Sequence, residues 1–157
     1  MKNKNSGFKE ISISLNKIQD CKFYCNLDFK CNREALEEGK LPYKILVKWN
    51  FSYNLEEDLF NIDLSVGYEE FDTQALILEA ENRFVFHVKD LRSLVKIQNE
   101  NSFSLEVDFL PTLINIAIGT MRGIIYSRTG SSSLSEFPLP MMSMNELINN
   151  AQSQVIK

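Results

Sequence analysis

The stretch from Phe109 to Arg128 carries more apolar surface than a helix with one side in water needs. Apolar residues recur at every fourth position, and others widen the zone well past a single stripe. The two sets are Phe109, Leu113, Ala117, Met121 and Ile125, and Leu110, Ile114, Ile116, Ile118 and Ile124. A surface helix normally has an apolar arc of about 100°, so this helix should be covered on both sides. The chain has one sheet to offer. The second side is therefore left for another copy or an apolar ligand, unless a monomer buries the whole helix.

Two glycines inside this helix indicate a close contact. Asp108 is the expected N-cap, Pro111 fits the first turn, and Gly130 is a natural stop. Gly119 and Gly123 should each cost about 1 kcal/mol relative to alanine. We therefore expect another helix to approach the ridge that they leave bare. Polar and charged residues interrupt the run, which argues against a membrane span.

Four segments alternate between apolar and polar residues, as strands with one face in water do. They cover residues 8–31, 43–54, 60–68 and 76–88. Short acidic turns join the last three segments, which predicts an antiparallel meander, whereas the charged stretch 32–42 is typical of a crossover loop. Cys21, Cys25 and Cys31 all lie at odd-numbered positions of the first segment, which would place them on the same face of a strand. They are predicted to be buried small apolar residues and not a bridge, because Cys21 and Cys25 would lie about 13 Å apart in a strand.

The C-terminal half adds helices to this sheet. Residues 90–98 contain a short possible helix, and Phe103 and Leu105 belong to either a short strand or an apolar loop. Two prolines keep residues 137–142 extended, and a capping box at 143–146 opens a second helix. The fold class is α+β: one domain over residues 1–157, with a four-stranded antiparallel sheet at about 8–88. A long and a short C-terminal helix, at about 109–129 and 144–155, pack on one face.

Composition excludes several function classes. The chain has 157 residues, of which 44% are hydrophobic, and its net charge of −4 argues against nucleic acid as a partner. The N-terminus lacks the apolar core of a secretory signal, so we expect a cytoplasmic protein without stable membrane insertion.

Signatures of enzymes and of metal or cofactor sites are also thin. His87 is the only histidine and has no neighbouring nucleophile, and Glu79 and Glu81 share a strand face without a third ligand. No metal-ligand cluster or phosphate loop is evident. We predict that the protein is not an enzyme and needs no metal or cofactor.

The candidate binding residues are apolar and adaptable. Phe137, Leu139, Met141 and Met142 form a strip that cannot be helical, and methionine re-packs readily against varied partners. The aromatic strand that carries Trp49, Phe51 and Tyr53 would supply a floor. The strip and the strand together predict a groove for an extended peptide; the alternative is that the strip packs on its own core.

The C-terminal third resembles the SecB family of export chaperones. The resemblance rests on residues 111–128, which contain Thr-Met-Arg-Gly-Ile-Ile-Tyr at 120–126, on Phe-Pro-Leu-Pro at 137–140, and on Asn-Glu-Leu-Ile at 145–148. It implies a SecB-like sheet-and-helix fold assembled as a homotetramer, a dimer of dimers. It also implies apolar grooves for unfolded polypeptide clients, with packing positions at Gly119, Met121 and Gly123. Docking to an export motor ATPase is part of the family pattern, but the chain lacks the strongly acidic C-terminal tail of many export SecBs.

The leading hypothesis is thus an ATP-independent chaperone, a holdase, that serves either export or one dedicated client such as an antitoxin. The rival is an oligomeric adaptor that binds a folded partner through an acidic patch on the sheet, with Glu69, Glu70, Glu79 and Glu81 as its candidates.

Overall fold

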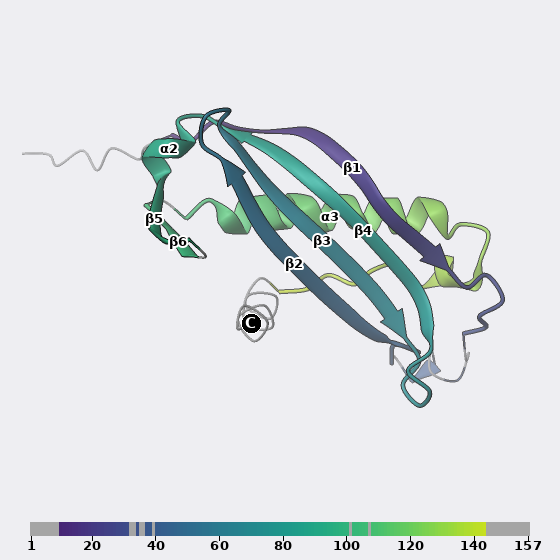
Figure 1. Cartoon of the computed structure of the whole chain (residues 1–157). Helices are drawn as coiled ribbons and strands as arrows, with labels where there is room; N and C mark the ends of the chain where they lie inside the picture. Colours follow the sequence, from purple (N-terminus) through teal and green to yellow (C-terminus); the bar gives the residue numbers. More distant parts are fainter. Residues whose placement is uncertain are drawn as a thin grey trace, which may run out of the picture.

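The chain forms one four-stranded antiparallel sheet with a long helix across one of its faces (Figure 1). The computed structural model describes residues 10–31, 34, 37–38, 40–100, 102–106 and 108–143. Its main elements are β1 (Ile13–Cys25), β2 (Lys44–Asn54), β3 (Leu59–Glu69), β4 (Leu76–Val88), α2 (Leu91–Leu94), β5 (Val95–Asn99), β6 (Ser102–Leu105), α3 (Leu110–Arg128) and the 3-10 turn η1 (Ser133–Glu136). The α+β class with its antiparallel sheet is confirmed, while the predicted second helix lies outside the described residues.

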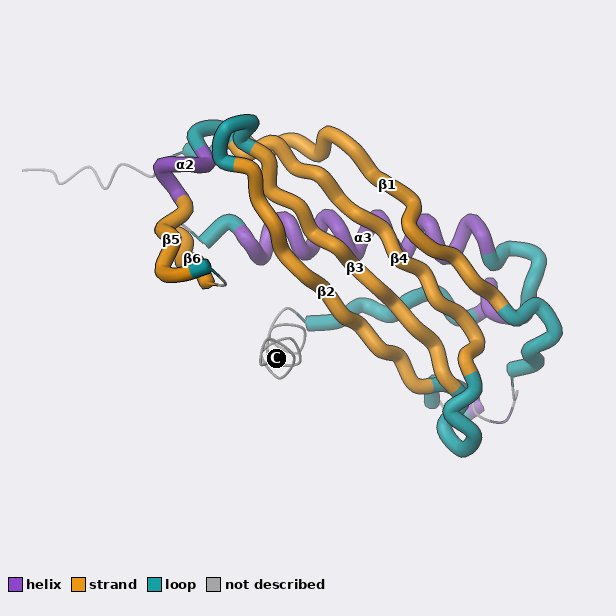
Figure 2. The backbone as a smooth tube through the Cα atoms, viewed as in Figure 1, coloured by secondary structure: helices purple, strands orange, loops and turns teal. Residues whose placement is uncertain are grey.

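The strand order is β1-β4-β3-β2. Strands β2, β3 and β4 pair with their sequence neighbours, which confirms the predicted meander. Strand β1 instead pairs with β4, so the chain crosses from one edge of the sheet to the other between β1 and β2. Strands β5 and β6 form a separate two-stranded sheet beside the end of β2, which settles Phe103 and Leu105 as strand residues (Figure 2).

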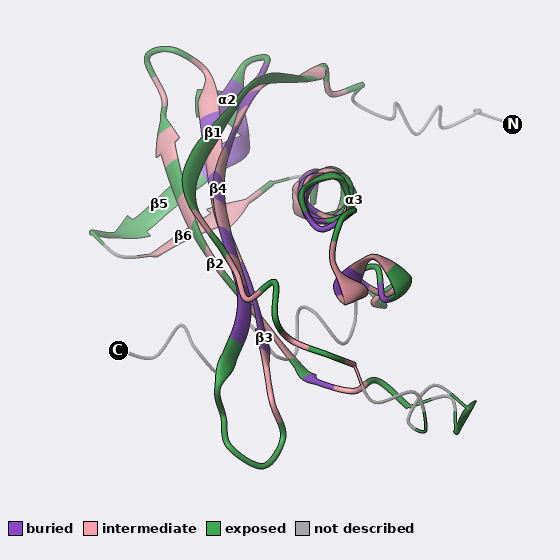
Figure 3. Ribbon diagram, turned by 90° about the vertical axis from the view of Figure 1, so that its right-hand side faces the viewer, coloured by how far each residue is buried: buried purple, intermediate pink, exposed green. Residues whose placement is uncertain are grey.

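The core lies between α3 and the two central strands (Figure 3). Alternate residues of β3 and β4 face the helix and are at most 3% exposed. They are Phe60, Ile62, Leu64, Val66, Tyr68, Leu78, Ala80, Asn82, Phe84, Phe86 and Val88. The helix contributes Leu113, Ile114, Ala117, Ile118, Met121 and Ile125. The core is thus formed by every second side chain of the two strands and by the helix side chains that recur every three or four residues on the side facing the sheet.

The helix begins and ends almost where the sequence predicts. It starts at Leu110, and Phe109 holds the N-cap position without a side-chain cap, so the predicted Asp108 cap is wrong. At the other end, the backbone N–H and the hydroxyl of Thr129 both donate to the carbonyl of Ile125, at 3.0 and 2.8 Å. No described helix is long and apolar enough to cross a membrane.

The prediction that all three cysteines are buried is wrong. Cys21 is exposed, and Cys25 and Cys31 are half-buried. The pairing of β1 with β4 shifts between Leu15 and Lys17 and again between Asp20 and Lys22. Each bulge changes the parity of the strand, so Cys21 does not share the helix-facing side with Cys25.

Candidate peptide-binding site

The apolar face of the sheet is wider than the helix that covers it. On edge strand β1, Leu15 pairs with Phe86 and Ile18 with Phe84, so these side chains belong to the helix-facing side. Phe84 and Phe86 are fully buried, yet Leu15 is 37% and Ile18 41% exposed. Apolar surface of the helix-facing side therefore remains open along β1.

The aromatic row predicted on β2 lies on this same face. Trp49, Phe51 and Tyr53 pair with Leu64, Ile62 and Phe60 of β3 and are half-buried. Their rings form a chain of contacts, with 6.5 Å between the centroids of Trp49 and Phe51 and 5.3 Å between Tyr53 and Phe103 of β6. The three residues are thus brought together as expected, as a partly open aromatic surface at the second edge.

Residues 137–142, which we call the strap, do not form the open strip that the sequence suggested. After η1 the chain runs back beside α3 on the same side of the sheet (Figure 2). Phe137 is 5% and Leu139 1% exposed, whereas Met141 is 86% exposed. Met142 is half-buried against the core. Phe137 and Leu139 therefore fill apolar space, Met141 faces solvent, and the four residues share no single surface.

The strap is held through its backbone carbonyls. The hydroxyl of Tyr43 donates to the carbonyl of Phe137 at 2.9 Å. Arg122 of α3 donates from Nε to the carbonyl of Leu139 at 2.6 Å and from Nη2 to that of Pro140 at 3.0 Å. These contacts place the strap between the start of β2 and the middle of the helix.

A pair of buried tyrosines supports this end of the strap. Tyr43 and Tyr68 stack with ring centroids 4.3 Å apart, and the ring of Phe137 meets that of Tyr43 edge-on at 6.1 Å. Burial raises the pKa of both tyrosines well above the usual range. Tyr43 therefore stays protonated as a donor. Tyr43 and Arg122 are site residues that were not predicted from the sequence, although a lone arginine in an apolar stretch of helix is a usable signal.

The three residues grouped as packing positions on α3 are separated by the structure. Met121 is fully buried against the sheet within the monomer, so it is not available to another copy. Gly119 and Gly123 are exposed, and a Cβ at either would meet no atom of the other described residues within 4 Å. Ile116 and Tyr126, 37% and 56% exposed, are further exposed apolar residues of the helix.

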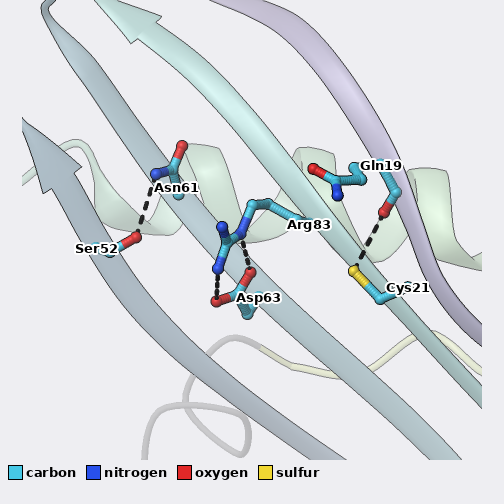
Figure 4. A network of polar contacts seen from close by, with 6 residues as sticks. All are labelled: Gln19, Cys21, Ser52, Asn61, Asp63 and Arg83. Atoms are coloured by element: carbon cyan, nitrogen blue, oxygen red, sulfur yellow. Dashed lines mark hydrogen bonds and ion pairs between the residues drawn. The ribbon is translucent and has the colours of Figure 1, made fainter.

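The opposite face of the sheet is polar and carries both signs of charge (Figure 4). A hollow of about 430 Å³ is lined by residues that include Lys48, Asp63, Glu79, Glu81 and Arg83. Arg83 binds Asp63 through two hydrogen bonds of 2.6 and 2.8 Å, and Glu79 pairs with Lys22. Glu79 and Glu81, two of the four predicted acidic residues, are thus interleaved with basic ones. The described residues contain no group of three or more potential metal ligands.

Comparison with known proteins adds no functional description. No protein-family model matches the sequence, and no curated protein matches it. Solved structures of similar arrangement include a protein of unknown function from Streptococcus agalactiae, at 10% sequence identity and a TM-score of 0.44. The match covers 86% of this chain and 99% of that one.

Proposed function

We propose that the protein is an ATP-independent chaperone of SecB-like design that binds extended, unfolded polypeptide segments. The observation that carries the proposal is the apolar surface on the helix-facing side of the two edge strands, which is exposed on β1 and partly exposed on β2. Leu15 and Ile18 are exposed on β1, and Trp49, Phe51 and Tyr53 are half-buried on β2. Apolar surface of this kind on a soluble domain typically marks an interaction site.

Burial of apolar surface is the driving force in this proposal. It contributes roughly 25 cal/mol per Å² of apolar area removed from water and requires little sequence specificity. An extended segment exposes its side chains alternately, so a strip along a strand edge takes every second side chain. Holding a client unfolded in this way needs no covalent chemistry.

The proposal includes assembly as a homotetramer. A second copy could cover the outward side of α3 at Gly119 and Gly123, where the described part of the chain leaves space beside each glycine. Assembly would also bring the open edges of several protomers together into longer apolar tracks, which suits clients that are tens of residues long. The clients would be either exported proteins or one dedicated partner such as an antitoxin.

The primary test is aggregation of a chemically unfolded client, diluted with and without the protein in the absence of ATP. We expect suppression near one tetramer per client, together with a tetrameric mass by light scattering. A folded oligomer that leaves aggregation unchanged would exclude a general holdase and direct the search to one dedicated partner.

Matched variants assign the activity to the apolar edge. Replacing Leu15 and Ile18 with serine should reduce suppression severalfold, because both side chains are exposed on the helix-facing side. Leu46→Ser is the control, because Leu46 lies on the polar face of β2 opposite Gly67. Equal losses in both variants would contradict the assignment.

Trp49 provides a second readout, since it is the only tryptophan in the chain. The client for this experiment has no tryptophan and is kept unfolded by reduction and carboxymethylation. Its binding should shift the fluorescence emission of Trp49 to shorter wavelengths, because the half-buried indole ring loses contact with water. Unchanged emission on saturation with client would remove the aromatic row from the site.

The second candidate function is an adaptor that binds a folded partner through the polar face of the sheet. The hollow beside Lys48, Asp63 and Arg83 is the observation that favours it. Serine substitutions at Leu15 and Ile18 would leave such a partner bound, whereas Arg83→Glu would release it. The two functions are therefore separable with the same set of proteins.

A further inference from the structure

The rest of the chain holds the strap as an extended segment, through buried side chains and backbone carbonyls. Two side chains two residues apart, Phe137 and Leu139, are inserted into the apolar core, while the intervening Pro138 is exposed. Tyr43 and Arg122 hold the backbone, at three carbonyl oxygens. The strap thus shows what kind of ligand this part of the molecule accepts.

The polar contacts depend on the backbone and not on the strap's own side chains. Tyr43 and Arg122 are donors, and a carbonyl is available at every residue of any peptide. The two prolines of the strap have no N–H, so the strap brings mainly acceptors to a site that offers donors. An unrelated extended segment with large apolar residues at positions i and i+2 could make the same contacts.

The strap is also only partly anchored. Met141 is 86% exposed and Met142 half-buried, so the inward anchors are concentrated at Phe137 and Leu139. The first residue of the strap after η1, Phe137, contacts Tyr43. Tyr43 directly precedes β2, the strand that carries the aromatic row. A segment that replaced it would lie on the same face of the sheet as that row.

We propose that the strap is an internal substitute for a client and occupies the strongest client site of the monomer. A client segment that carries large apolar residues two apart displaces it, engages Tyr43 and Arg122 through its own carbonyls, and fills the space of Phe137 and Leu139. This proposal rests on the proposed chaperone function and specifies the client: an extended apolar-x-apolar segment. Phe137 and Leu139, which the sequence suggested as client-binding residues, are in this proposal competitors of the client for the groove.

The test uses a fluorescent peptide with the sequence of residues 135–142, Ser-Glu-Phe-Pro-Leu-Pro-Met-Met, added to the full-length protein. Leu139→Ser removes one anchor of the strap and leaves Tyr43 and Arg122 intact. We expect it to bind the peptide roughly ten- to a hundredfold more tightly than the unsubstituted protein, the ratio that corresponds to losing the burial of one leucine. A peptide with serine in place of both anchors should bind neither protein.

A second variant covers the case in which Leu139→Ser does not fold. Pro138→Gly keeps both anchors but makes the free strap more flexible, and Pro138 is exposed and has no N–H to lose. It should bind the peptide about two- to fivefold more tightly. Met141→Ser, at an exposed position of the same strap, is the matched control and should change nothing. Equal or weaker binding by folded Leu139→Ser, or by Pro138→Gly, would overturn the proposal.

The aggregation assay separates this inference from the proposed function. If the unsubstituted protein suppresses aggregation and Pro138→Gly is no more potent, the chaperone function stands and the strap is a fixed part of the fold. If neither protein suppresses aggregation but the peptide still binds Pro138→Gly more tightly, the general holdase function fails and the displaceable strap stands.

Discussion

The central and edge strands of this sheet have the same helix-facing pattern and very different surroundings. Phe84 and Phe86 on β4 are fully buried beneath α3. Their direct neighbours on β1, Ile18 and Leu15, are 41% and 37% exposed. The sequence makes no distinction between the two strands, because both carry apolar residues on that side. The difference teaches that alternation determines which side of a strand is apolar, while the cover above it determines how much is buried.

The widths of the two layers explain the difference. An α-helix with its side chains is about 10–12 Å across. Four strands spaced about 4.8 Å apart span about 14 Å between the outermost backbones, and more with their side chains. One helix can therefore bury two strands, which here are β3 and β4, and leaves the helix-facing side of both edges to other partners. The strap covers only the Tyr43 end of β2.

The largest expected effect comes from testing this contrast directly. Phe84→Ala should lower the free energy of unfolding by about 3–5 kcal/mol, because it opens a cavity in a fully buried site. Ile18→Ala, in the register position next to it, should cost less than about 1 kcal/mol. Urea denaturation measures both. A large, concentration-dependent cost for Ile18→Ala would instead mean that a second chain covers β1 in solution.

The strands could be predicted from the sequence because period two is a local property. Within residues 43–88, the positions of one parity in each strand are apolar, apart from Asn82, so the meander followed from pattern and short turns. The bulges in β1 could not be read in the same way. They depend on how β1 fits against β4, and no residue near Cys21 announces the shift that turns its side chain outward.

The second effect concerns the outward side of α3. Gly119→Ala should stabilise an isolated monomer by about 1 kcal/mol, because alanine favours helix and the added methyl group clashes with none of the residues that the structure describes. If another copy packs there, as we propose, Gly119→Leu should instead split the oligomer. Light scattering and urea denaturation of both variants distinguish the cases. An unchanged mass for Gly119→Leu would place the interface elsewhere.

The candidate site was predictable only in part. The face of Trp49, Phe51 and Tyr53 followed from alternation, and the extended form of residues 137–142 followed from two prolines. Whether Phe137 and Leu139 line a groove or fill one depends on the space that α3 leaves beside β2, which is a tertiary property. The same holds for Met121, whose position on the inward side depends on how the helix is rotated against the sheet.

A smaller effect is expected on the polar face. Arg83 and Asp63 form a two-point ion pair, yet their side chains remain 44% and 36% exposed. Arg83→Gln should therefore cost only about 0.2–1 kcal/mol, and less in high salt. Urea denaturation at low and high ionic strength is the measurement. A cost near that of Phe84→Ala would show that a partner buries this face.

The smallest effect should come from pH, at a polar break in the apolar face of the sheet. Asn82 on β4 is 3% exposed and donates to Asp20 on β1 at 2.6 Å, while Arg128 at the end of α3 donates to the same carboxylate. The hydrogen bond from Arg128 is the larger cause and that from Asn82 the second, and together they hold the pKa of Asp20 below its usual 3.8. A carboxyl with a lowered pKa contributes stability above the unfolded-state value, and that contribution is lost as the pH falls through the folded-state value.

The stability advantage of the natural chain over Asp20→Asn should therefore be constant near neutral pH and shrink below about pH 3.8. Urea midpoints at pH 7 and pH 3 test this. An advantage that is the same at both pH values would mean that Asp20 joins the edge strand to the centre through its shape and hydrogen bonds and not through its charge.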